Sequence, residues 1–282
     1  AQKYEVESCT NKEAFRKKLI GAIKEIINAC KNLDTVYDTG ENGPKTICRP
    51  LLLLHNIQTV INQNKGFKER EDYQLGVFYK FPFHLFKKEL WNVEHIDSNT
   101  TNELDTKTEQ ENWLKVSWYF LSGSKELRDK IEAYLDEKDE SKREFESLYK
   151  EIIEHFGTTE ALKQDDKNKI WNFVLLDEHT NKSYGNAIFP MKKMVISGKD
   201  RCLEYYLEDT GKKGEFTGVK IEVKKLDPAA SKYKTAFVPP VTKSAFMKEF
   251  NPLSANPYSW DRDDAEKYKE NIKTTLKDFL ID

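Results

Sequence analysis

The chain has 282 residues, of which 33% are charged and 12% aromatic, and its formal net charge at pH 7 is −2. This length allows a sizeable core in one large or two modest domains, and the composition is typical of a soluble globular protein. No apolar run approaches the ~20 residues of a membrane-spanning helix, and the start of the chain lacks a charged-then-apolar export signal. We therefore expect a cytoplasmic protein with no membrane partner.

The first 80 residues are expected to form a helical region. Residues 11–32 carry an amphipathic pattern, for which Thr10 or Asn11 is a suitable cap. A turn-rich stretch with Gly40 and Gly43 follows. A second helix is predicted from about residue 49 to 62, because Pro50 suits a first helical turn.

A short strand is predicted at residues 93–96, and helices dominate from about residue 109 to 156. Ser141 and Glu144 have the spacing of a capping box, and Gly157 is expected to end the last of these helices. We interpret residues 99–165 as a helical insertion.

Residues 174–176 are expected to form a second strand, followed by a turn at 177–180 and a helix that begins near Asn181. The last part of the chain, residues 200–282, is predicted to be an α+β region. It contains strand-like runs at 202–207 and 219–223 and a final helix from about Asp261, with Ser259 as its candidate cap. Tyr268, Ile272, Leu276 and Leu280 form the apolar side of that helix.

The four cysteines are scattered and include no Cys-x-x-Cys pair. This argues against a structural zinc site and against a disulfide framework. Free thiols in a reducing compartment are the simple interpretation.

Two separated segments contain residues suited to phosphodiester hydrolysis. Glu94 and His95 are adjacent, and Asn172 and Asn181 follow later, nine positions apart. A histidine titrates near neutrality and can activate a water molecule. A carboxylate and an amide oxygen are ligand types that a hard divalent ion accepts. Neighbouring strand residues point to opposite faces, so Glu94 and His95 can serve one site only at a bulge or a strand end.

The order of these residues resembles the ββα-metal, or HNH, nuclease motif, and more specifically the C-terminal nuclease region of GmrSD-type restriction and phage-defence proteins. The similarity extends from about residue 46 to the end of the chain. It rests on the segments 81–83, 91–96, 172–176, 181–193 and 237–243, together with Trp260, Asp264 and Ala265.

The resemblance implies an α+β, mostly helical fold, with a small ββα-metal core at 81–98 and 166–199 interrupted by the helical insertion. It implies a metal-dependent DNA endonuclease. His95 would be the general base and Asn172 a brace for its loop, while Glu94 and Asn181 would hold one Mg²⁺ or Mn²⁺. In that family an NTP-sensing domain commonly precedes this region, so such a domain is a possible partner.

Contacts with the phosphate backbone are expected from nearby polar side chains. A net charge of −2 means that basic groups must be concentrated locally if the chain binds a polyanion. Lysine acts on phosphate as a point charge. The candidates near the motif are Lys182, Asn186, Lys192 and Lys193.

Less specific interpretations stay open. Asn172 and Asn181 are of a type that often occupies turns and helix caps, and His179 is a rival histidine within a predicted turn. Asn92 stands where the family often has an acid, and Glu94 where many HNH sites have Asp. These departures favour an alternative function, a catalytically silent nucleic-acid-binding or assembly module that retains the HNH fold.

Overall fold

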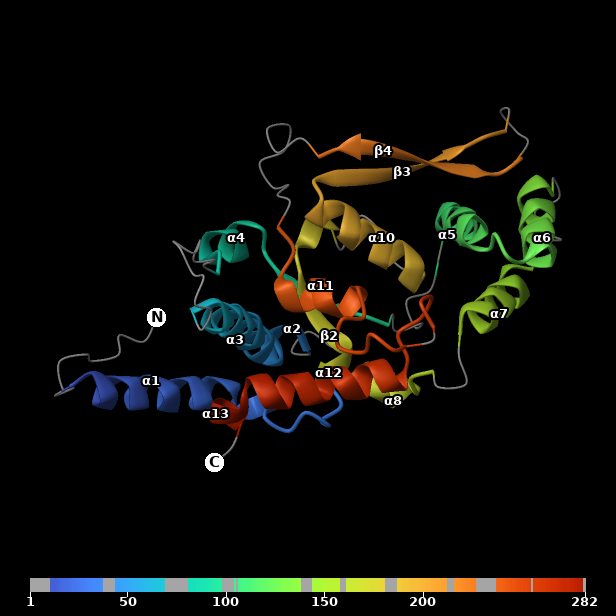
Figure 1. Ribbon diagram of the computed structural model, residues 1–282. Helices are drawn as coiled ribbons and strands as arrows, with labels where there is room; N and C mark the ends of the chain where they lie inside the picture. The colour runs from blue at the N-terminus through green and yellow to red at the C-terminus, as the bar shows by residue number, and fades with distance from the viewer. Residues whose placement is uncertain are drawn as a thin grey trace.

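The computed structural model describes residues 11–37, 44–68, 81–97, 104, 106–137, 144–157, 161–180, 187–211, 216–226, 237–254 and 256–280. These residues form a mixed fold of many helices and two small antiparallel sheets, each with two strands (Figure 1). The α+β class expected from the sequence is therefore confirmed.

The elements follow one another along the chain with the same labels as in Figure 1. In order they are α1 (Lys12–Ile27), a 3-10 turn η2 (Asn28–Cys30), α2 (Pro44–Ile47), α3 (Arg49–Lys68), α4 (Phe83–Lys88), β1 (Asn92–His95), α5 (Lys107–Phe120), α6 (Lys125–Asp136), α7 (Phe145–Phe156), α8 (Gln164–Lys167), η4 (Ile170–Asn172), β2 (Phe173–Leu176), α10 (Phe189–Asp200), β3 (Leu203–Asp209), β4 (Val219–Lys225), α11 (Pro240–Phe246), α12 (Arg262–Thr275) and α13 (Lys277–Leu280).

The N-terminal helices form where the sequence predicted them. Asn11 caps α1, since its side-chain oxygen accepts a hydrogen bond from the backbone N–H of Ala14 at 2.9 Å. The helix ends at Ile27 and tightens into η2, so it is shorter than the predicted range. Helix α3 runs to Lys68, beyond the predicted end.

Two predicted caps differ from the structure. Glu144 is at the N-cap of α7 and makes no side-chain cap bond, while Ser141 lies outside the described residues. Asp261, rather than Ser259, caps α12, because its carboxylate accepts the N–H of Asp264 in a reciprocal capping box. A carboxylate at this position also interacts favourably with the positive end of the helix dipole.

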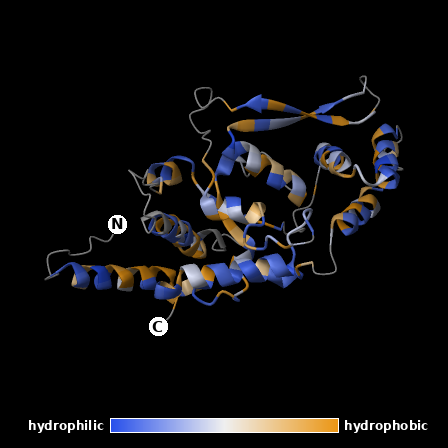
Figure 2. Ribbon diagram, viewed as in Figure 1, coloured by the Kyte–Doolittle hydropathy of each residue, from blue (hydrophilic) through white to orange (hydrophobic). Residues whose placement is uncertain are grey.

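The central sheet pairs the two motif segments. Strand β1 lies antiparallel to β2, with Glu94 opposite Val174 and His95 opposite Phe173. All four residues of β2 are buried. The strand is accordingly in hydrophobic colours in Figure 2, whereas α12 is largely hydrophilic.

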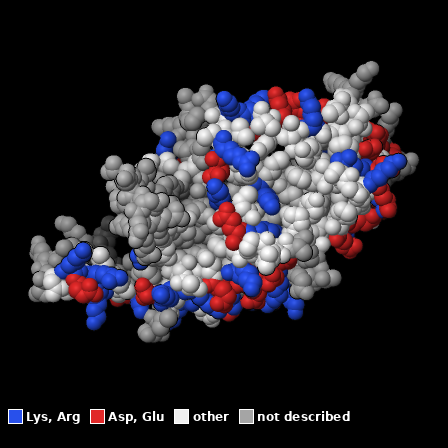
Figure 3. Space-filling model, in the orientation of Figure 1, with Lys and Arg blue, Asp and Glu red and all other residues white. Residues whose placement is uncertain are grey.

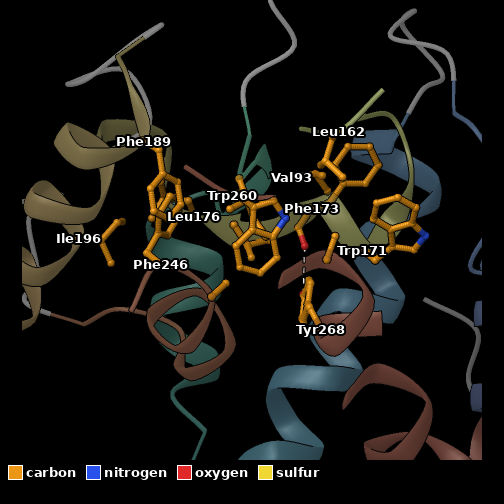
Figure 4. Packing of buried hydrophobic residues seen from close by; sticks show 14 of the residues in the cluster. Val93, Leu162, Trp171, Phe173, Leu176, Phe189, Ile196, Phe246, Trp260 and Tyr268 are labelled. Atoms are coloured by element: carbon orange, nitrogen blue, oxygen red, sulfur yellow. Dashed lines mark hydrogen bonds between the residues drawn. The ribbon is translucent and has the colours of Figure 1, made fainter. Parts of the chain in front are cut away.

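The outer edge of β2 is closed by side chains from helices. The carbonyl of Phe173 accepts a bond from the Tyr268 hydroxyl of α12 at 3.1 Å (Figure 4). The carbonyl of Leu175 accepts one from the Thr242 hydroxyl of α11 at 2.5 Å. These bonds satisfy backbone groups that would otherwise need a third strand, and they explain how a two-stranded sheet sits in a buried core.

The remaining elements cover this centre. Helix α3 packs against β2 and α11, and the long β3–β4 hairpin lies over α10 at the top of Figure 1. Gly198 makes room for the hairpin, since a Cβ at that position would lie 2.1 Å from the ring of Tyr205. The predicted insertion forms α5, α6 and α7, which stand together on one side.

Two general expectations concern the described residues. Cys30, Cys48 and Cys202 carry free thiols, as expected, and Cys9 lies outside the described residues. Among the helices that the structure describes, none combines the length and apolar character needed to cross a bilayer.

A buried histidine links α3 to α12. His55 is fully buried, its Nε2 lies 2.8 Å from the side-chain oxygen of Asn271, and its ring stacks on Tyr268. Burial lowers the pKa of His55 from 6.5 to about 4, against the opposing effect of the Asn271 contact. The folded protein therefore keeps this ring neutral where the unfolded chain binds a proton.

We predict that His55 makes the fold sensitive to mild acid. Its contribution is fully present above pH 6.5 and is lost as the pH falls from 6.5 towards 4, because the unfolded chain takes up the proton first. The free energy of unfolding should drop by about 2 kcal/mol between pH 7 and pH 5 from this group alone. His55→Gln keeps a donor for Asn271 but cannot titrate, so urea unfolding of the variant should show a correspondingly smaller drop. An equal drop in both proteins would contradict the assignment.

Candidate functional site

The paired strands bring Glu94, His95 and Asn172 together. His95 is the last residue of β1, and Asn172 immediately precedes β2 on the opposite side of the ladder. The register is regular from Asn92 to His95, so β1 contains no bulge. Of the two geometries expected from the sequence, a bulge or a strand end, the structure has the strand end, at His95.

His95 lies in a half-buried position with defined neighbours. Its Nε2 is 3.1 Å from the side-chain oxygen of Asn168, and its ring meets Phe173 edge-on with centroids 4.8 Å apart. Because the Asn168 oxygen is an acceptor, Nε2 carries the proton and Nδ1 is the nitrogen with a free lone pair. Burial lowers the pKa of His95 below its ordinary value, and the Asn168 contact and the nearby Glu94 charge oppose this effect. The imidazole is thus neutral at pH 7.

Asn172 holds the chain directly after His95. Its side chain is fully buried, accepts the N–H of Asp97 at 2.9 Å, and donates to the carbonyls of Asp97 and Lys167, both at 2.9 Å. Its own carbonyl accepts the N–H of Ile96 at 2.9 Å. Removing this amide would break three hydrogen bonds to partly buried backbone groups, at ~1–3 kcal/mol for each group left unsatisfied.

Glu94 is paired with a buried lysine. The Nζ of Lys192, from α10, is 3.1 Å from Glu94 Oε1 and 3.1 Å from the backbone carbonyl of His95. The Lys192 side chain is only 1% exposed, whereas that of Glu94 is 14% exposed. Lys192 was expected at the phosphate; in the structure it is beneath the strand end, where its charge balances the carboxylate.

The other predicted site residues divide into two groups. Lys193 is half-buried on α10. Burial and the charge of Lys248 lower the pKa of Lys193, and the charge of Asp264 opposes this effect. The charged neighbours of Lys193 therefore belong to the C-terminal region. Asn181, Lys182 and Asn186 lie outside the described residues. The described helix that follows them, α10, begins at Phe189.

Sequence reasoning missed Asn168 and underrated Asp97. Asn168 contacts the imidazole from the turn before η4, and no spacing rule identifies such a residue in advance. Asp97 forms an ion pair with Lys167 at 3.2 Å, and burial raises its pKa against the effect of that lysine. The rival His179 is exposed in the helical turn that follows β2.

The side chains at the end of β1 include one ligand of the type that a hard divalent ion binds. Glu94 supplies a carboxylate of the kind that Mg²⁺ and Mn²⁺ take, and one or two carboxylates with water suffice for magnesium. Among the described residues, however, no group of three His, Cys, Asp or Glu side chains forms a ligand cluster. An ion held here would have to share Glu94 with the Lys192 ammonium.

Comparisons with family models, with curated proteins and with solved structures found no match to this chain.

Proposed function

We propose that this protein is an HNH-type, metal-dependent DNA endonuclease, the nuclease part of a restriction or phage-defence system. The observation that carries the proposal is the pairing of β1 with β2. It joins residues far apart in sequence into one site, in which His95 ends a strand and Asn172 fixes the loop after it. Helix α10 then follows the two strands in the order of a ββα unit.

The residues of the chain would share the work as follows. His95 would take a proton from water at Nδ1, since Asn168 holds the opposite ring nitrogen. Asn172 would keep the imidazole in place through the loop backbone. Glu94 and Asn181 would hold one Mg²⁺ or Mn²⁺, which as a Lewis acid polarises a phosphate and stabilises the departing oxygen.

DNA is proposed as the substrate on the strength of the family resemblance. The charges on the face drawn in Figure 3 mix both signs, so binding to a polyanion would depend on local groups such as Lys193, with Lys182 and Asn186 as further candidates. The same resemblance motivates cytoplasmic action on foreign or modified DNA and an NTP-sensing domain as a partner.

A second candidate function is favoured by one observation. The Lys192 ammonium already neutralises Glu94 at 3.1 Å, which suits a module that keeps the fold but holds no ion. In that case the protein would bind nucleic acid or assemble with a partner without cutting. The two candidates differ in what happens when a divalent ion is added.

The first prediction concerns the general base. Plasmid DNA with Mg²⁺ or Mn²⁺ should be nicked by the wild type, and His95→Ala should reduce the rate by about 10²–10⁴-fold. His179→Ala is the matched control, since it removes an exposed histidine of the same region and should leave the rate unchanged. Equal cutting by wild type and His95→Ala would exclude His95 as the base, and no cutting by the wild type would favour the silent module.

The second prediction concerns pH. The lowered pKa of His95 keeps the imidazole neutral over a wider range, so activity should be constant from pH 7 to 8 and should fall only as the pH drops through a value below 6.5. The acid limb of kcat/KM for plasmid nicking measures this value. A midpoint above pH 7 would contradict the role of a buried, neutral histidine.

The third prediction separates the two candidates through Lys192. If Glu94 is an ion ligand, Lys192→Met removes a competing cation, so calorimetry should show tighter Mn²⁺ binding than in the wild type. Glu94→Gln should abolish binding in either background. If wild type and Lys192→Met both fail to bind Mn²⁺ while remaining folded by circular dichroism, the metal-dependent function is rejected.

A further inference from the structure

A cavity of about 130 Å³ adjoins the candidate site. Its lining includes Ile96 and Asp97, the two residues after His95, and Phe189 at the start of α10. Helices α5 and α7 of the insertion also line it. The insertion thus forms one wall of a cavity that lies next to the end of β1, where His95 is located.

The walls of this cavity are largely aromatic. Trp113 of α5, Tyr149 of α7 and Trp260 from the segment before α12 all line it. The rings of Trp113 and Tyr149 are 4.7 Å apart and tilted by 40°. Flat aromatic side chains of this kind bind flat ligands, because every nucleobase has a face that can stack on them.

Polar groups are present in the same lining. Asp97 and Lys167 line the cavity and form an ion pair at 3.2 Å, which sets an acceptor next to a donor. The edge of a pyrimidine base also presents a donor next to an acceptor, so the pair complements it.

The size of the cavity favours a single ring. An apolar cavity of about 150 Å³ accommodates benzene, so a space of about 130 Å³ limits the part of a ligand that enters it to about one six-membered ring. A purine, with two fused rings, fits less well.

Hydrogen bonds of Asn172 connect the lining of the cavity to the candidate site. The Asn172 amide donates to the carbonyls of Asp97 and Lys167, and it accepts the N–H of Asp97 in the loop that follows His95. A ligand that orders Asp97 and Lys167 therefore acts on the segment that positions the imidazole.

We propose that this cavity receives one unstacked pyrimidine base of the DNA strand handled at His95. The inference rests on the proposed function. It adds which part of the substrate the cavity binds, a base outside the DNA double helix. Extrusion of a base costs a few kcal/mol and costs least where the base is already unpaired. Binding should therefore be strongest where the DNA already presents a free pyrimidine.

The test measures binding of the full chain to short duplexes by fluorescence anisotropy in EDTA, so that no cutting occurs. The probes are a fully paired duplex and matched duplexes with one extrahelical cytosine, thymine, adenine or abasic site. We expect the two pyrimidine duplexes to bind about tenfold more tightly than the paired and abasic duplexes, with adenine in between.

Two pocket variants and one control define the site. Ala161 is an exposed lining residue, so Ala161→Leu should block the mouth and abolish the pyrimidine preference while binding to paired DNA is retained. Asp97→Asn preserves side-chain size and the backbone bonds to Asn172, and it should weaken the preference without filling the space. Ala133→Leu, on the exposed face of α6, should behave like the wild type.

Each outcome has one meaning. No pyrimidine preference in the wild type, or an equal preference in Ala161→Leu, overturns the proposal. Binding of free cytidine or thymidine that Ala161→Leu abolishes, without any preference among duplexes, also overturns it, because the ligand would then be a free nucleoside. Plasmid nicking is measured separately. Nicking without a preference for the pyrimidine duplexes supports the nuclease and rejects the base-binding cavity. A preference for the pyrimidine duplexes without nicking supports the cavity and rejects the nuclease.

Discussion

The hydrogen bonds of Asn172 are the constraint on which the rest of the candidate site depends. One buried amide binds the backbone of Asp97 through two bonds and that of Lys167 through a third. It fixes the exit of β1, the approach to β2 and one part of the cavity lining together. Since a buried amide must satisfy both its donors and its acceptor, these segments have little freedom to move independently.

Around this point the protein builds a core from a very small sheet. Two four-residue strands cannot form a stable unit alone. Here the second strand is buried, and the hydroxyls of Tyr268 and Thr242 occupy its outer carbonyls. Two helices of the C-terminal region, α11 and α12, are thereby tied to the strand that carries Phe173, the ring against which His95 packs edge-on.

Charge near the strand end is held in buried pairs. Lys192 faces Glu94, and Lys199 of α10 bonds Asp177 and Thr180 after β2, at 2.8 and 3.1 Å. Such pairs contribute geometric specificity rather than a large net stability, because desolvation offsets most of their attraction. Helix α10 is thus attached by lysines to β1 and to the turn after β2, which fixes its orientation.

The sequence by itself predicted the helices α1, α3 and α12, both strands of the central pair, and Glu94, His95 and Asn172 as neighbours at their ends. Local signals such as Asn11 before an amphipathic stretch, or Gly157 after one, act within a few residues and so can be recognised from the sequence alone. Only the tertiary structure decided that Lys192 points at Glu94 rather than at solvent, that Asn168 contacts His95, and that the insertion encloses a cavity. These features depend on contacts between segments distant in the chain, and composition and periodicity carry no information about which side chains such contacts bring together.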